Sequence, residues 1–95
     1  ELCDLVICLS HLGYNYRNEA EKPSDLTLAR ATKNIDLIIG GHTHTFLRKP
    51  TIVKNSDEKN VLVNQVGSYG LYLGKIDFYF DGEKNKSANG TTIVV

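Results

Sequence analysis

Three histidines are the residues of this sequence best suited to metal chemistry. His11 follows one short apolar segment, and His42 and His44 follow a second apolar segment and the pair Gly40-Gly41. A neutral imidazole binds Zn, Mn or Fe without cancelling the charge of the ion, and that charge lowers the pKa of a bound water. The two glycines allow a sharp turn that brings imidazoles close to an ion. The sequence therefore predicts a divalent-metal site at His11, His42 and His44; the alternative is that each is a surface or hydrogen-bonded histidine.

A βαβ unit is expected to position these histidines. Residues 2–9 and 35–39 are apolar and rich in branched side chains, which predicts two strands buried on both faces. Residues 14–22 read as a loop, and Pro23-Ser24-Asp25 predicts a helix start, capped by Ser24 or Asp25, with an end near residues 33–34. A helix between two strands makes the strands parallel. Both histidine loops then emerge at the carboxyl edge of the sheet, where ligands bind in open α/β sheets.

The second half of the chain has a different pattern. Pro50 and the polar residues 55–60 suggest an exposed connection, and residues 61–65 predict a strand. Residues 71–80 predict a long strand, and turn-forming residues at 81–85 lead to a last strand at 91–95 that pairs back as a hairpin. The expected fold class is α/β, with a parallel first half and an antiparallel second half.

Composition excludes several classes of protein. A chain of 95 residues allows one small domain at most. Eleven basic and eleven acidic residues give no net charge, which argues against binding to a nucleic-acid polymer. The longest apolar run, residues 5–9, is far shorter than the roughly 20 residues of a membrane span. No methionine occurs, so we expect the chain to be part of a longer one.

Two cysteines, Cys3 and Cys8, lie in the first apolar segment. They would point to opposite faces of a strand and could not bridge each other, so we interpret both as buried small apolar residues.

For five further polar residues the sequence gives less evidence of a functional role than for the histidines. Asn64 and Gln65 end a strand near the histidine edge, where they either reach the site directly or cap backbone groups. Tyr14 and Tyr16 follow His11 and are either substrate contacts or half-buried loop aromatics. Asp36 starts the second strand at the opposite edge and is expected to be a solvated charge.

Two motifs and one longer segment resemble a known family. Gly41-His42-Thr43-His44 resembles the closing Gly-His-x-His motif of the calcineurin-like metallophosphoesterases. Ser10-His11 resembles the preceding Gly-His motif of that family, with Ser10 in place of the glycine. The glycine-spaced residues 64–74 resemble the segment that follows the metal site in the 5′-nucleotidase branch. The resemblance covers roughly residues 3–80 and implies part of an α/β/β/α sandwich.

The resemblance implies a metal-dependent hydrolase with two divalent ions (Zn, Mn or Fe). Such an enzyme releases phosphate from nucleotides through attack of a metal-bound hydroxide. By position in the motifs, His11 and His42 match ligands of one ion, and His44 matches a ligand of the other. The family also suggests a location in the periplasm or at the cell surface of a bacterium.

The earlier motifs of the family are missing from these residues. No Asp-x-His, Gly-Asp or Asn-His sequence occurs. We therefore expect residues 1–95 to be the C-terminal half of a metallophosphoesterase catalytic domain, inactive alone. It would bind the missing N-terminal half or self-associate through its apolar strands. The alternatives are a cyclic-nucleotide phosphodiesterase, a nucleotide-sugar hydrolase, or a non-catalytic metal-binding α/β module.

Overall fold

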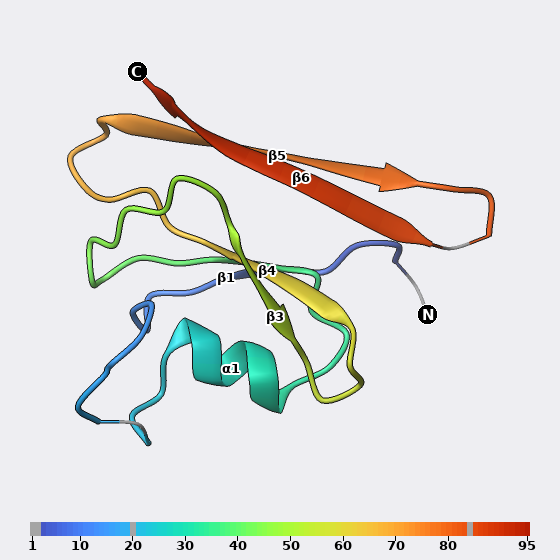
Figure 1. The fold of residues 1–95 in the computed structure, drawn as a ribbon, viewed down its shortest axis with the longest axis horizontal. Coiled ribbons are helices and arrows are strands. Elements are labelled where there is room, and N and C mark those ends of the chain that lie inside the picture. Colours follow the sequence, from blue (N-terminus) through green and yellow to red (C-terminus); the bar gives the residue numbers. More distant parts are fainter. Residues whose placement is uncertain (1–2, 20, 84) are drawn as a thin grey trace.

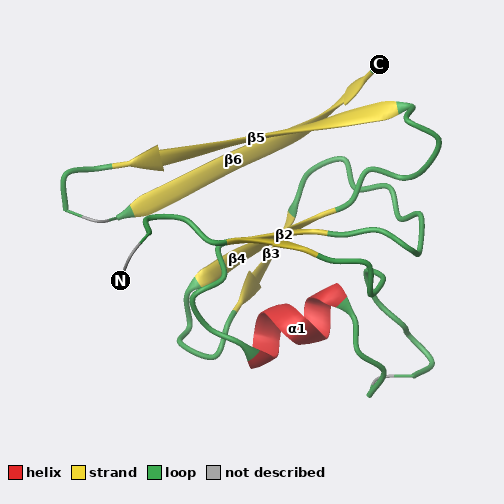
Figure 2. Ribbon diagram, turned by 180° about the vertical axis from the view of Figure 1, so that it is seen from behind, coloured by secondary structure: helices red, strands yellow, loops and turns green. Residues whose placement is uncertain are grey.

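A helix, a four-stranded sheet and a two-stranded hairpin form three layers in the computed structural model, which describes residues 3–19, 21–83 and 85–95 (Figure 1). Figure 2 shows the helix on one side of the larger sheet and the hairpin on the other. The larger sheet has the order β1-β2-β4-β3, and β5 pairs with β6. The elements are β1 (Ile7–Leu9), α1 (Asp25–Ala31), β2 (Leu37–Ile39), β3 (Thr51–Lys54), β4 (Asn60–Asn64), β5 (Tyr72–Phe80) and β6 (Lys86–Val94). The predicted α/β class is confirmed.

The βαβ unit forms as predicted. Strand β1 pairs in parallel with β2, with Ile7 opposite Leu37, and β4 pairs in parallel with β2 on its other side. The loops that follow β1 and β2 therefore leave the sheet at the same carboxyl edge. This places the segments that carry His11, His42 and His44 side by side.

The prediction that both parallel strands are buried on both faces is wrong for β1, whereas in β2 it holds for Leu37 and Ile38, which are 4% and 0% exposed, and fails at Ile39. Ile7 and Leu9 are 48% and 79% exposed, and Ile39 is 42% exposed. Side chains alternate between the faces of a strand, so Cys8 and Ile38 face α1 while these three face the other way. The helix face is covered, whereas the opposite face is open at β1, which is an edge strand. Leu2, the first apolar residue of the predicted strand, lies outside the described residues.

Helix α1 begins where the sequence predicted and ends earlier. Ser24 is the cap: its hydroxyl accepts a hydrogen bond from the Thr27 N–H at 3.3 Å, and the Thr27 hydroxyl accepts from the Ser24 N–H at 2.8 Å. The helix ends at Ala31, because Thr32 is extended. The buried residues of the core are Leu26 and Ala29 of the helix with Ile38, Val53, Val61 and Val63 of the sheet.

The exposed connection predicted at residues 50–60 is in part a strand. Strand β3 pairs antiparallel with β4, with Ile52 opposite Leu62. The turn between them is tied by the buried side chain of Asn55, whose oxygen accepts hydrogen bonds from the N–H groups of Asp57 and Lys59 at 2.8 and 3.0 Å. A strand of four residues beside a proline gives too short a pattern to recognise in a sequence.

The β5–β6 hairpin packs against the segment that precedes β3. The Thr92 hydroxyl donates to the Leu47 carbonyl at 2.6 Å, and the Thr92 N–H donates to the Arg48 carbonyl at 3.1 Å. A side chain at Gly90 would lie 2.6 Å from the Pro50 ring, so glycine is needed there for close approach. Strand β6 starts at Lys86, earlier than the predicted residue 91, and these contacts hold it over the sheet.

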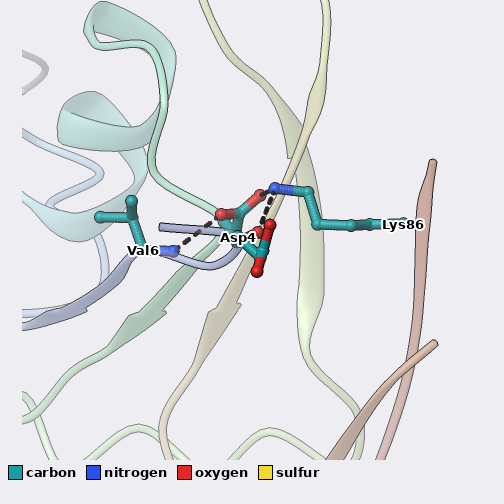
Figure 3. A network of polar contacts seen from close by, with 4 residues as sticks. Asp4, Val6 and Lys86 are labelled. Carbon is teal, nitrogen blue, oxygen red and sulfur yellow. Dashed lines mark hydrogen bonds and ion pairs between the residues drawn. The ribbon is translucent and has the colours of Figure 1, made fainter. Parts of the chain in front are cut away.

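A polar network joins the hairpin to the amino edge of the large sheet (Figure 3). The Asp36 carboxylate accepts a hydrogen bond from the Val6 N–H at 2.9 Å and pairs with the Lys86 ammonium at 2.8 Å. Lys86 also donates to the Asp4 carbonyl at 3.0 Å. The prediction that Asp36 is a solvated charge is wrong, because β6 brings a lysine from the far end of the chain beside it.

The two cysteines are free, as expected from their spacing, but they differ in burial. Cys8 is half-buried and packs against the core, whereas Cys3 is exposed. The interpretation of Cys3 as a buried residue is therefore wrong. In the part of the chain that the structure describes, no helix is long and apolar enough to cross a membrane.

Candidate functional site

The candidate site lies at the carboxyl edge of the large sheet. His11 follows β1, and His42 and His44 follow β2, each in a loop that begins within a few residues of the strand end. The loops are anchored at their first residues: Ser10 N–H donates to the Ile39 carbonyl at 2.9 Å, and Gly40 N–H donates to the Asn64 carbonyl at 2.9 Å. Hydrogen bonds between neighbouring strand ends thus fix where each histidine-bearing loop leaves the sheet.

His11 and His42 meet at this edge. Their ring centroids are 5.3 Å apart, with an interplanar angle of 71°. Both histidines are exposed to solvent. A side chain at Gly41 would lie 3.1 Å from His11 Nδ1, so the absence of a side chain there gives His11 room beside the second loop.

His44 has a different neighbour. Its ring centroid is 6.4 Å from that of Tyr69, an aromatic residue that is 90% exposed. Within the described residues, no group of three or more His, Cys, Asp or Glu side chains is arranged to hold a metal ion. The structure therefore brings His11 and His42 together and does not add His44 to that pair.

The backbone of the second loop is held in an uncommon conformation. His42 and His44 have φ angles of +73° and +53°, in the left-handed region that non-glycine residues rarely adopt. Tyr69, beside His44, has a φ angle of +68°. Such conformations cost of order 1–3 kcal/mol each and persist where surrounding contacts enforce them.

Threonine side chains supply contacts of this kind. The Thr43 hydroxyl accepts a hydrogen bond from the Tyr14 N–H at 3.0 Å, which ties the His11 loop to the loop of His42 and His44. The hydroxyls of Thr43 and Thr45 are 2.8 Å apart and share a hydrogen bond. These links hold the two loops as one unit.

A buried polar cluster lies beneath the loops. Asp25 is completely buried, and its Oδ1 accepts a hydrogen bond from the Ser10 hydroxyl at 2.6 Å. Gln65 is 3% exposed, and its Oε1 accepts hydrogen bonds from the Thr45 N–H and, at 3.4 Å, the Thr43 hydroxyl. Burial raises the pKa of the Asp25 carboxyl, and the hydrogen bond from Ser10 offsets part of that rise.

Sequence reasoning missed the place of Asp25, which it treated only as a possible helix cap. A usable signal was present, because the helix of a βαβ unit begins at the carboxyl edge of the sheet, so its first residue lies beside the ligand-binding loops. Of the two roles expected for Gln65, that of bonding to backbone groups fits, because Gln65 binds the backbone and side chains beside His44. Tyr14 and Tyr16 are half-buried, which fits the expected alternative of half-buried loop aromatics.

Two imidazoles at this separation fit part of a metal site. They come from different loops, they are exposed, and imidazole is a common metal ligand that suits Zn and Fe. Two ligands are fewer than the three or four protein ligands of ordinary zinc sites. The donor set therefore fits a divalent ion whose coordination is completed by other groups.

The fold of the chain is that of a segment of a 5′-nucleotidase. It superposes on the crystal structure of a 5′-nucleotidase precursor from Thermus thermophilus with a TM-score of 0.78 and 33% identity, over 96% of this chain and 19% of that one. This likeness confirms the predicted fold, with a parallel-strand sheet, a helix and antiparallel strands.

Curated relatives agree with this assignment. The chain is 43% identical over 81 residues to the trifunctional nucleotide phosphoesterase protein YfkN of Bacillus subtilis. The matched region covers 85% of this chain and 5% of that protein. It is 32% identical over 93 residues to a snake venom 5′-nucleotidase of Gloydius brevicauda, over 84% of this chain and 14% of that protein. Apyrases of mosquitoes, such as that of Aedes aegypti at 30% identity over 97 residues, match 84% of this chain and 16% of the relative.

The chain is therefore homologous to a segment of the 5′-nucleotidases and apyrases, and the resemblance found in its sequence is confirmed. It spans between 5% and 19% of the length of the relatives and the solved structure described above. No family model matches it.

Proposed function

We propose that this chain is the histidine-bearing part of a hydrolase that releases phosphate from nucleotides with the help of two divalent ions. The observation that carries the proposal is the pairing of His11 with His42 at the carboxyl edge of the sheet, with ring centroids 5.3 Å apart. Homology to 5′-nucleotidases, apyrases and a nucleotide phosphoesterase supports nucleotides as the substrate class.

Each histidine has a separate task in this proposal. His11 and His42 would hold one ion between the loops that follow β1 and β2, and His44 would contribute to the second. When bound, the ions lower the pKa of a water and polarise the phosphoryl group. The chain's own contribution is to hold neutral imidazoles at fixed positions on a rigid sheet edge, so that the ions keep their charge.

The reaction is proposed for the intact protein and not for these residues alone. The sequence lacks the Asp-x-His, Gly-Asp and Asn-His pairs that complete the metal sites by resemblance. The 95-residue chain alone is therefore expected to release no phosphate from nucleotides. Snake venom relatives support a secreted or cell-surface setting, and a bacterial periplasmic location stays a prediction.

Phosphate release by the intact protein tests the proposal. We expect hydrolysis of AMP that stops when EDTA removes divalent ions and resumes when zinc or manganese is added back. His42→Ala should lower kcat/KM more than the roughly 10–100-fold that loss of a residue supporting a ligand costs. Thr91→Ala, at an exposed position on β6, is the matched control and should leave the rate unchanged.

The substrate panel also separates the alternatives. Faster hydrolysis of cyclic AMP or of a nucleotide sugar than of AMP would move the protein to another branch of the same superfamily. Metal binding with no hydrolysis of any of the three substrates would contradict the proposal and favour a non-catalytic metal-binding module.

A further inference from the structure

The most unusual feature of the candidate site is a buried carboxylate with one oxygen left without a partner. Asp25 has no exposed surface, and its Oδ1 is bonded to Ser10. Its Oδ2 is buried and has no hydrogen-bond partner among the described residues. Burying a carboxylate without full hydrogen bonding is costly, so a purely structural position would be better filled by an apolar side chain.

Asp25 lies directly against both histidine loops. Ser10, which donates to it, is the residue before His11. Gly40 starts the stretch that leads to His42, and a side chain there would overlap Asp25 Oδ2. The Asp25 N–H also donates to the Gly13 carbonyl at 2.8 Å, so the residue contacts the His11 loop through its backbone as well.

Gln65 approaches the same point from β4. Its amide oxygen holds the segment around His44 through Thr45 N–H. Its Nε2 is buried and has no hydrogen-bond partner among the described residues, and it would lie 3.5 Å from a side chain at Gly40. An acceptor that lacks a donor and a donor that lacks an acceptor therefore both lie near the position that a Gly40 side chain would take.

We infer that Asp25 and Gln65 are paired positioning residues, which hold the three histidines in place through the loop residues that they contact. Asp25 acts through Ser10 on His11 and through Gly40 on His42, and Gln65 acts through Thr45 on His44. The unmet Asp25 carboxylate oxygen and the unmet Gln65 amide N–H are complementary groups that lie beside Gly40, where one water could bond to both. This inference rests on the proposed function, because it assigns the cluster a role in metal binding.

An exchange of donor and acceptor tests the pairing in the intact protein. Asp25→Asn puts a second N–H donor near the Gln65 N–H, and Gln65→Glu puts a second carboxylate near Asp25 Oδ2. We expect each single change to weaken zinc affinity, measured by calorimetry, by about tenfold or more. The double variant Asp25→Asn/Gln65→Glu restores complementarity in the reverse sense and should recover most of that affinity.

Two further variants separate positioning from folding. Ser10→Ala removes the half-buried hydroxyl that donates to Asp25 and accepts from the Leu12 N–H, and it should weaken zinc affinity in a protein that circular dichroism shows to be folded. Asn55→Asp, a matched amide-to-carboxylate change at a buried position in the β3–β4 turn, should leave zinc affinity unchanged. If Asp25→Asn does not fold, Gln65→Glu and Ser10→Ala decide the question.

The outcomes distinguish this inference from the proposed function. If the unmodified protein binds neither zinc nor manganese, the proposed function fails. If it binds zinc but Ser10→Ala and Gln65→Glu bind with the same affinity, the positioning role is wrong. The pairing is also wrong if the double variant binds no better than the weaker single variant.

Discussion

The two edges of the large sheet differ in whether the carboxylate oxygens of their acidic residues have hydrogen-bond partners. At the amino edge, both oxygens of Asp36 have partners, one in the Val6 N–H and one in the Lys86 ammonium. At the carboxyl edge, Asp25 is more deeply buried but one of its oxygens lacks a partner among the described residues, as does the amide nitrogen of Gln65. Buried polar groups are usually paired, so exceptions call for an explanation.

The difference in hydrogen bonding between the edges supports the proposed placement of the functional site at the carboxyl edge. The ion pair at the amino edge joins the hairpin to the sheet. The carboxyl edge combines unmet buried groups, two histidines with positive φ and an exposed imidazole pair. Strained and unsatisfied groups of this kind cluster at functional sites, where they serve binding or catalysis.

Filling the space at Gly40 should give the largest effect at the carboxyl edge. In Gly40→Ala the new methyl group would overlap Asp25 Oδ2 and must displace the carboxylate. We expect the free energy of unfolding, measured by urea titration, to fall by about 3 kcal/mol, and zinc affinity to fall with it.

The control for this change is Gly82→Ala in the β5–β6 turn. A side chain at Gly82 meets no atom within 4 Å, so stability and zinc affinity should stay as they are. Equal effects of the two alanines would mean that contact with Asp25 is not the cause.

Removal of the Asp36 carboxylate should give a smaller effect, confined to stability. Asp36→Ala leaves the Val6 N–H and Lys86 without their partner, and we expect a loss of about 1 kcal/mol in the free energy of unfolding. Zinc affinity should not change, because the amino edge lies away from the histidines.

An exposed ion pair provides the reference for Asp36. Lys75→Met removes the pair with Asp77, whose side chains are 57% and 40% exposed, and should have no measurable effect on unfolding. A loss of zinc affinity in Asp36→Ala as large as that in Gly40→Ala would contradict the separation of the two edges.

The smallest effect is a pH dependence with opposite signs in two regions. Burial raises the pKa of Asp25 in the folded state, so the folded state binds its proton more tightly, and stability falls as pH rises from the ordinary aspartate pKa to the raised one. Hydrogen bonds from Asn85 and Glu83 lower the pKa of Asp81 in the exposed β5–β6 turn. That contribution is present above the ordinary aspartate pKa and is lost as pH falls through the lowered one.

Urea unfolding across the acidic range up to neutral pH would check both signs. The stability of the unmodified chain relative to Asp25→Asn should decrease as pH rises, and its stability relative to Asp81→Asn should decrease as pH falls. The same sign for both variants would contradict these assignments.

The sequence predicted the local elements better than the contacts between them. The βαβ order, the start of α1 after Ser24 and the long strand at β5 follow from residue patterns of short range. The exposure of Ile7 and Leu9 and the pairing of Asp36 with Lys86 depend on which distant segments cover a strand. Because those contacts join parts of the chain that are remote in sequence, local patterns could not show them.

The candidate site was also predictable only in part from the sequence. The histidines could be found from residue type and position after a strand, and their shared edge followed from the parallel topology. Gln65 was expected near this edge from its position after a strand, and the start of the helix could have placed Asp25 there. Their burial and their unmet hydrogen bonds could not be predicted, because these depend on how the distant segments pack. Whether the open face at β1 leads to self-association stays a prediction.

A calorimetric titration of the intact protein with zinc and manganese tests the central claim most directly. It should be carried out beside a variant in which His11, His42 and His44 are all changed to alanine, after circular dichroism has shown that both are folded. The account predicts micromolar or tighter binding by the unmodified protein that is lost in the variant. Equal binding by both proteins, or no binding by the unmodified protein, would contradict the assignment of these histidines as metal ligands.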